Sequence, residues 1–189
     1  MIRIGIVGDI GSGKSFVAKC FGYPVFDADA EVIKLYQTNK NCFDKLKKIL
    51  PKNIISFPIK KKEISQAIIS NKSNIKKIIK IVHPVIRLKM NKFLNKNKNK
   101  KIIILDVPLL LENKLNKKND ILIFIDAKKY EILKRLKKRK NFNLKLFKKF
   151  KKIQLPLEYK RKKSQFILKN NFTNKTVKKN IKRIIKEIL

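Results

Sequence analysis

The residues most able to do chemistry form a glycine-rich segment near the start of the chain. It reads Gly8-Asp9-Ile10-Gly11-Ser12-Gly13-Lys14-Ser15 and matches the phosphate-binding pattern G-x-x-x-x-G-K-[ST]. Glycines allow backbone conformations closed to other residues, so successive N–H groups can surround an anion. In such loops the lysine reaches the β- and γ-phosphates of ATP, and the hydroxyl holds Mg²⁺. We therefore expect residues 8–16, ending at Phe16, to bind ATP, with Lys14 catalytic and Ser15 a magnesium ligand.

The chain around this loop has the order that the motif requires. An apolar run, Ile2 to Val7, precedes the loop, which is followed by apolar residues at helical spacing, Val17, Ala18 and Phe21. A helix that begins near Lys14 would add a partial positive charge beside the phosphate. A glycine-rich turn without a ligand is the alternative, and the strand–loop–helix context disfavours it. Because the Asp9 carboxylate would repel phosphate, we expect it to face solvent or a metal-bound water.

Two carboxylates follow the next apolar run, at Asp27 and Asp29. In an extended segment, residues two apart face the same side, and one carboxylate can take a proton from an attacking hydroxyl. The pattern D-x-D alone is more often a helix cap or a turn. Its place after a phosphate-binding unit, at the end of a predicted strand, favours a catalytic role.

The single histidine, His83, is followed by Pro84, and Arg87 lies four residues further on. Proline is tolerated in the first turn of a helix, so we expect a helix to begin here, with the His83 ring at its N-terminal flank and directed into a cleft. A lone histidine is more often structural than chemical, and this feature by itself does not indicate catalysis.

A further carboxylate, Asp106, ends the most apolar run of the chain, Ile102 to Leu105. Such a run is typical of a central strand buried on both faces. A carboxylate at the end of that strand can hold Mg²⁺ through a water molecule. The segment Pro108-Leu109-Leu110-Leu111-Glu112 follows, and we expect Glu112 at the edge of the cleft.

Five apolar runs in all are predicted to be strands, and helical patterns separate most of them. This order predicts an α/β fold: a parallel sheet built from βαβ units, with helices on both faces. Besides Ile2 to Val7, the predicted strands are Tyr23 to Phe26, Lys101 to Val107, Asp120 to Ile125 and Gln165 to Leu168. The chain should end in a helix with a cap at Thr173 or Asn174.

Two long intervals do not fit single crossovers. Residues 29–100 contain several helix-like stretches, Phe43 to Leu50, Lys61 to Ser70 and Ile75 to Leu94, and are predicted to form a helical insertion that holds the phosphate acceptor. Residues 137–163 are densely cationic and are predicted to form a lid, with a solvated helical hairpin as the alternative. The nucleotide-binding core would then comprise residues 1–28, 101–136 and 164–189.

The net charge is +37, which ordinarily points to nucleic acid or an anionic membrane. Lysine outnumbers arginine 44 to 6, and isoleucine and asparagine are abundant while alanine and glycine are scarce. This is the composition of an AT-biased genome, and it is the favoured explanation of the charge; nucleic-acid binding remains the alternative. Where lysine is the default cation, the retained arginines become candidates for phosphate contacts: Arg87, Arg135, Arg139 and Arg161.

The remaining composition predicts a cytoplasmic protein. No apolar run approaches the ~20 residues of a membrane-spanning helix. The first residues form a strand that leads into the phosphate loop, which argues against a cleaved signal peptide. Cys20 and Cys42 have neither metal-ligand spacing nor the density of a disulfide scaffold. The sequence does not predict an oligomeric state.

These segments, in this order, resemble the dephospho-coenzyme A kinase family over nearly the whole chain. Besides the glycine-rich loop, the resemblance rests on four segments: Pro24 to Asp29, His83-Pro84-Val85-Ile86-Arg87, Asp106 to Glu112 and Leu155 to Arg161. The glycine-rich loop marks only a superfamily, whereas D-A-D, H-P-x-[IV]-R and P-L-L-x-E together make the resemblance specific. It implies a five-stranded P-loop kinase core with helical acceptor and lid regions.

The resemblance also implies a reaction and roles. ATP and 3′-dephospho-CoA would give ADP and CoA, with Mg²⁺ as cofactor and Asp29 as the general base on the ribose 3′-hydroxyl. Acceptor binding would involve Asp27, His83, Arg87, Pro108, Leu109 and Glu112, and Arg139 and Arg161 would belong to the lid. The chain departs from the family pattern at Asp9, Phe16 and Lys169. The alternatives are another small P-loop kinase, acting on a nucleoside monophosphate or small alcohol, and a basic nucleic-acid-binding P-loop protein.

Overall fold

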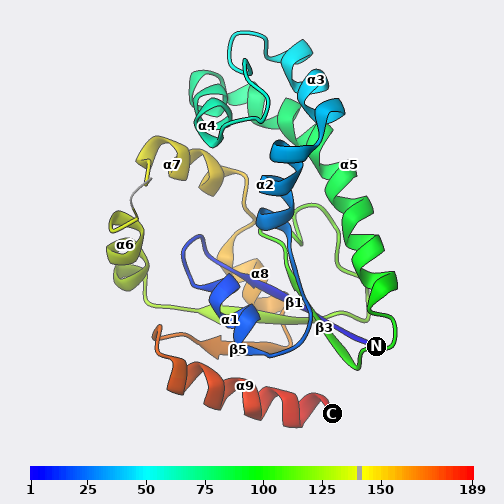
Figure 1. Cartoon of the computed structure of the whole chain (residues 1–189). Helices are drawn as coiled ribbons and strands as arrows, with labels where there is room; N and C mark the ends of the chain where they lie inside the picture. Colours follow the sequence, from blue (N-terminus) through cyan, green and yellow to red (C-terminus); the bar gives the residue numbers. More distant parts are fainter. Residues whose placement is uncertain (140–141) are drawn as a thin grey trace. The chain divides into compact units, whose positions relative to one another are not determined.

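The computed structural model describes residues 1–139 and 142–189, and it contains a five-stranded sheet (Figure 1). All strands are parallel, in the order β2-β3-β1-β4-β5. Their bounds are β1 Ile2–Gly8, β2 Val25–Asp27, β3 Ile102–Asp106, β4 Ile121–Asp126 and β5 Phe166–Lys169. The predicted α/β class and the five predicted strands are confirmed, with strand ends displaced by two residues at most.

The central strands explain the apolar runs of the sequence. Every residue of β3 is buried, because both faces of this strand are covered. On one face, Ile4 and Ile6 of β1 join a core with helix α1 (Lys14–Cys20) and helix α9 (Asn174–Ile188). On the other face, a Cβ at Gly5 would collide with the Leu110 and Leu122 side chains, and helix α8 (Leu157–Lys163) contacts β1 and β4.

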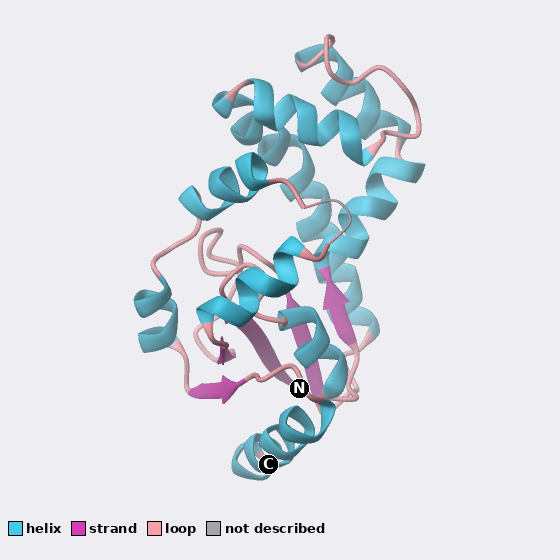
Figure 2. Cartoon of the chain, turned by 90° about the vertical axis from the view of Figure 1, so that its left-hand side faces the viewer, coloured by secondary structure: helices cyan, strands magenta, loops and turns pink. Residues whose placement is uncertain are grey.

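The chain divides into two units. Unit 1 comprises Met1–Asp27, Asn97–Phe142 and Ile153–Leu189, and unit 2 comprises Ala28–Lys96 and Asn143–Lys152. Unit 1 contains the sheet and helix α6 (Lys129–Lys137) in addition to α1, α8 and α9. Unit 2 is helical (Figure 2), and its helices are α2 Ala28–Thr38, α3 Lys40–Ile49, α4 Lys61–Ser70, α5 Lys72–Lys96 and α7 Leu144–Lys152.

Unit 2 is organised around α5, which contacts α2, α3 and α4, while α7 contacts α4. The helix-like stretch predicted over Ile75 to Leu94 is confirmed by α5. The expectation that Pro84 stands in a first helical turn is wrong, because α5 begins at Lys72 and runs through this proline. Proline removes one helical N–H donor. The buried side chains Ile78, Val82, Ile86 and Met90 lie on both sides of it along one stripe, and this packing keeps the helix continuous.

The predicted lid, residues 137–163, contains α7 and α8, which belong to different units. Lys140 and Asn141, within that predicted segment, lie outside the described residues. Along the described chain, no helix is both long enough and apolar enough to cross a membrane.

Candidate active site

The phosphate loop connects the carboxyl end of β1 to α1, as its pattern predicts. Gly11 and Gly13 have φ angles of 83° and 89°, a left-handed region that favours glycine. At Gly13 the reason is also steric, because an added Cβ would collide with the Asn170 side-chain amide and approach the Phe172 ring. The loop therefore needs glycine both for its backbone path and for its contact with the segment after β5.

Lys14 folds back over this loop. Its Nζ donates to the carbonyl oxygens of Asp9 at 2.7 Å and Gly8 at 3.3 Å, which places the ammonium over the loop backbone. The Asp9 Oδ1 accepts a hydrogen bond from the backbone N–H of Ile10 at 2.6 Å, and its position toward solvent or a metal-bound water stays a prediction. The carboxylate thus stabilises the loop locally.

Ser15, Asp27 and Asp106 supply hydroxyl and carboxylate oxygens on unit 1. Asp27 and Asp106 are opposite each other in the register of β2 and β3, and the Asp106 carboxylate is hydrogen-bonded to the Ser15 side chain. Burial raises the pKa of Asp106, and the nearby Asp27 charge raises it further, while Ser15 and Lys14 act in the opposite direction. Two carboxylates and a hydroxyl are the hard oxygen donors that Mg²⁺ prefers.

This donor set fits a nucleotide-bound Mg²⁺ better than a resident metal. Among the described residues, no group of three His, Cys, Asp or Glu side chains could hold a metal ion. Mg²⁺ commonly takes only one or two protein ligands and completes its shell with substrate phosphates and water. The predicted magnesium ligand Ser15 and the predicted water-mediated ligand Asp106 are therefore close together.

The segment after β5 adds residues to which sequence reasoning gave no role. Asn170 is buried, and its Nδ2 donates to the Ser12 carbonyl in the phosphate loop at 2.8 Å. Phe172 has a φ of 62° and carries its ring 4.3 Å from the Arg135 guanidinium. The sequence marks Arg135 as a candidate for a phosphate contact, and its contact with Phe172 was not predicted. The family that the sequence resembles has I-D-N where this chain has Leu168-Lys169-Asn170, and this shared asparagine was the usable signal.

On unit 2, Asp29 is the second residue of α2 and is exposed. His83, half-buried, and Arg87, exposed, are four residues apart on α5 and so share one face of this helix. An ion pair between Lys89 Nζ and Glu31 Oε2, at 2.6 Å, joins α5 to α2. Asp29, His83 and Arg87 thus lie on two helices that pack against each other.

Comparisons with known proteins identify the family. A family model described as dephospho-CoA kinase matches residues 2–176. The chain belongs to the dephospho-CoA kinase family. A dephospho-CoA kinase of Wolbachia sp. subsp. Brugia malayi (strain TRS) is 39% identical over 129 residues, 66% of this chain and 66% of the relative. That of Wolbachia pipientis wMel is 36% identical over the same shares. These matches span about two thirds of each relative.

Solved structures agree with this assignment. TT1252 from Thermus thermophilus has a TM-score of 0.79 and 27% identity, over 100% of this chain and 98% of that one. The dephospho-CoA kinase from Campylobacter jejuni has a TM-score of 0.63 and 24% identity, over 98% and 96%, and supports the fold alone. The match of the family model over residues 2–176 confirms the predicted dephospho-CoA kinase family.

The structure places the other residues that the family resemblance singled out on unit 1. Arg139 is exposed just beyond α6, and Arg161 of α8 pairs with Asp126 Oδ2 at 3.4 Å. Pro108 and Leu109 are half-buried in the turns after β3. Glu112 is already engaged, because its Oε1 lies 2.7 Å from Lys160 Nζ.

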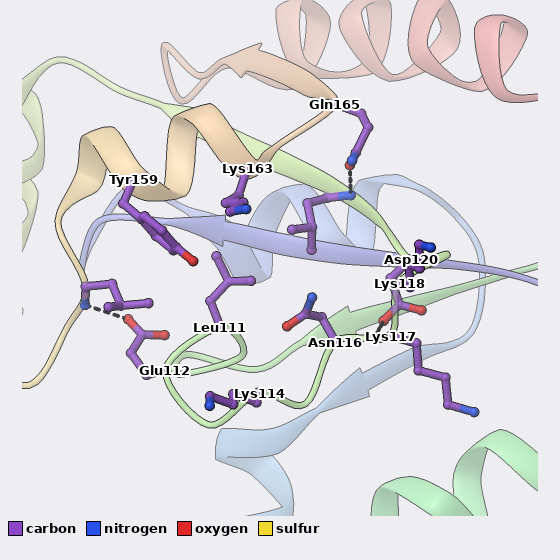
Figure 3. Close-up of a pocket in the computed structure, with 12 residues that line it drawn as sticks. Leu111, Glu112, Lys114, Asn116, Lys117, Lys118, Asp120, Tyr159, Lys163 and Gln165 are labelled. Atoms are coloured by element: carbon purple, nitrogen blue, oxygen red, sulfur yellow. Dashed lines mark hydrogen bonds between the residues drawn. The ribbon is translucent and has the colours of Figure 1, made fainter.

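Unit 1 also has a cavity of about 460 Å³ beside α8 (Figure 3). It lies near the amino-terminal ends of β4 and β5, whereas the phosphate loop follows the carboxyl end of β1. Four of its twelve lining residues are lysines, about one more than the lysine share of the whole chain, 44 of 189, would give. Its carboxylates, Glu112 and Asp120, are paired with Lys160 and Arg3. The lining therefore gives no specific signal of a second ligand in this family member.

Proposed function

We propose that this chain transfers the γ-phosphate of ATP to the ribose 3′-hydroxyl of dephospho-CoA, giving ADP and CoA. Membership of the dephospho-CoA kinase family supports the reaction. The observation that carries the proposal in the structure is the phosphate loop with Lys14 over it and the Ser15–Asp106 hydrogen bond beside it. Phosphoryl transfer depends mainly on positioning and on electrostatic stabilisation, and this set of groups provides both.

Each residue of the loop then has a role. The backbone N–H groups of residues 8–16 surround the phosphates, and Lys14 neutralises charge that develops on the transferred group. Ser15 would hold Mg²⁺, and Asp106 would hold one of its waters. When bound with ATP, Mg²⁺ supplies charge neutralisation across the β- and γ-phosphates.

The acceptor roles rest on the family resemblance and on the positions in unit 2. Asp29 would accept the proton of the 3′-hydroxyl, while Asp27, His83, Arg87, Pro108 and Leu109 would orient the acceptor. Arg139 and Arg161 would contact phosphate from the lid. Residues 29–100 would then form the acceptor region. We place the reaction in the cytoplasm. We expect no nucleic-acid partner, since the lysine-rich composition of an AT-biased genome explains the net charge of +37.

The test measures ADP release from Mg-ATP with and without dephospho-CoA, at near-physiological salt, and identifies the second product. Release that depends on dephospho-CoA, with CoA formed, supports the proposal. A panel with a nucleoside monophosphate and shikimate serves as control, since a shikimate kinase from Acinetobacter baumannii shares the fold with a TM-score of 0.53 at 15% identity. If the protein is folded and binds ATP but its ADP release does not depend on dephospho-CoA, the proposed function is contradicted.

A further inference from the structure

One buried ion pair on unit 1 joins two segments that are far apart in the sequence. Lys160 Nζ in α8 lies 2.7 Å from Glu112 Oε1, and the Lys160 and Glu112 side chains are only 2% and 10% exposed. The same oxygen accepts a hydrogen bond from the Leu155 N–H at 3.0 Å, the contact dashed in Figure 3. One carboxylate of the turn after β3 therefore holds both α8 and the segment that leads into it.

This burial is exceptional for the chain. In the part of the chain that the structure describes, Lys160 is the one lysine that is buried. Desolvation of an ammonium and a carboxylate costs several kcal/mol per ion in typical proteins, and a packed apolar pair is often as stable or more stable. Stability alone therefore does not explain the pair, whereas a fixed geometry for α8 does.

The position of α8 matters because Arg161, the residue after Lys160 in this helix, reaches the carboxyl end of β4 near the phosphate loop. Arg161 NH1 lies 3.4 Å from Asp126 Oδ2 at the end of β4. The preceding residue, Ile125, is opposite Gly8, the first residue of the phosphate loop, in the register of β4 and β1.

A second set of contacts ties the same place to the phosphate loop. The Asp126 carbonyl accepts from the Asn170 N–H at 2.7 Å, and Asn170 Nδ2 donates to the Ser12 carbonyl. Contacts thus run from Glu112 through α8 to the phosphate loop.

We propose that Glu112 and Lys160 are positioning residues for phosphoryl transfer. Their ion pair fixes α8 on the turn after β3, so that the Arg161 guanidinium is held at the carboxyl end of β4, beside the phosphate loop. Glu112 acts through Lys160 and Leu155 and does not contact the acceptor. This inference deepens the proposed function and rests on it for the catalytic readout, but not for the nucleotide-affinity readout.

The first experiment removes both charges and keeps the packing. In the double variant Glu112→Gln/Lys160→Met, glutamine still offers an acceptor to the Leu155 N–H, and methionine fills the volume of the lysine. We expect a Tm near that of the wild type, as for other buried pairs replaced by neutral groups. We also expect Mg-ADP affinity lowered about fivefold and kcat lowered about tenfold, because Arg161 is no longer held in place. The KM for dephospho-CoA should stay unchanged.

A purely structural pair predicts a different result. Wild-type affinity and kcat in a double variant with wild-type Tm would overturn the proposal. Lys160→Arg, which keeps the charge, should recover most of the affinity and rate. The matched control is the exposed ion pair of Arg183 and Glu187 on α9, 3.7 Å apart. The double variant Arg183→Gln/Glu187→Gln should change neither Mg-ADP affinity nor kcat.

The second experiment does not depend on how well the double variant folds. Arg161 is exposed, so Arg161→Gln should fold normally and should lower Mg-ADP affinity and kcat by the same factors as the double variant. Adding Arg161→Gln to the double variant should lower Mg-ADP affinity and kcat little further, because all three substitutions remove the contribution of Arg161. Unchanged affinity and kcat in Arg161→Gln would overturn the proposal. If the wild type lacks dephospho-CoA-dependent turnover, the proposed function fails, while Mg-ADP affinity still decides this inference.

Discussion

The nucleotide end of unit 1 and the helices of unit 2 bring functional side chains into place by different means. In unit 1 the groups follow the ends of parallel strands, so the register of β1 to β4 fixes their spacing. In unit 2 Asp29, His83 and Arg87 project from two helices, and packing of α2 on α5 decides their separation. A buried sheet therefore fixes the proposed phosphate site rigidly, while the proposed acceptor residues depend on helix packing.

The comparison predicts that phosphate-loop variants affect binding and chemistry together. Lys14→Ala should lower kcat about 10³-fold and also weaken Mg-ATP affinity, because the ammonium over the loop stabilises both the bound phosphates and the transition state. Titration calorimetry with Mg-ATP in the absence of dephospho-CoA measures the affinity, and initial-rate kinetics measure kcat. Lys19→Ala, an exposed lysine of the same helix, is the control. A rate loss without an affinity loss would assign Lys14 to chemistry alone.

Substitution of the predicted general base should lower the rate without lowering the affinity for ATP. Asp29→Asn should lower kcat about 10²- to 10³-fold and leave ATP affinity near that of the wild type, since a general base acts in the transition state. The check is single-turnover CoA formation alongside ATP titration. Lys34→Gln, which removes an exposed charge from the same helix, is the control. Wild-type turnover in Asp29→Asn would remove Asp29 from the mechanism.

Acceptor residues on α5 should change the KM of a single substrate. Arg87→Gln should raise the KM for dephospho-CoA about tenfold and leave the KM for ATP unchanged, because a charge-assisted contact to the acceptor is lost. Steady-state kinetics, with dephospho-CoA and ATP varied in turn, measure the two KM values. Lys92→Gln, also exposed on α5, is the matched control. Equal changes in both KM values would contradict a specific acceptor contact.

The smallest expected effect concerns stability. Burial raises the pKa of Asp106, so folding disfavours its ionised form. Relative to Asp106→Asn, the wild type loses stability as pH rises from the ordinary Asp value of about 4 towards the raised pKa, and the loss is complete above it. Asp106→Asn should therefore raise Tm at neutral pH by roughly 2–4 °C. Below that window the difference should vanish.

Thermal unfolding across pH, without and with Mg-ATP, measures this effect. Since a bound cation favours the carboxylate, Mg-ATP should stabilise the wild type more than Asp106→Asn. A Tm difference that persists at low pH would show that the substitution acts through packing and not through ionisation.

Much of the fold was predictable because its signals are local. The run Ile102 to Leu105 predicted a strand buried on both faces, and Lys61–Ser70 was predicted with the bounds that α4 has. The stretch Ile75 to Leu94 predicted most of α5, but the helix start expected at Pro84 was wrong, since the buried stripe that α5 presents to its neighbours overrides the local preference of proline. Tertiary packing commonly overrides weak local propensity in this way.

The sequence by itself determined the phosphate loop and the five strands, because each depends on residues within a few positions of one another. It also determined the family, whose motifs are each local and follow one another in a fixed order. Only the tertiary structure decided that Glu112 pairs with Lys160, that Asn170 supports Ser12 and that Arg135 stacks on Phe172. The partners in each pair are tens of residues apart, and no local spacing encodes them. They meet because strand register and helix packing bring distant segments to the same place, which a pattern along the chain does not specify.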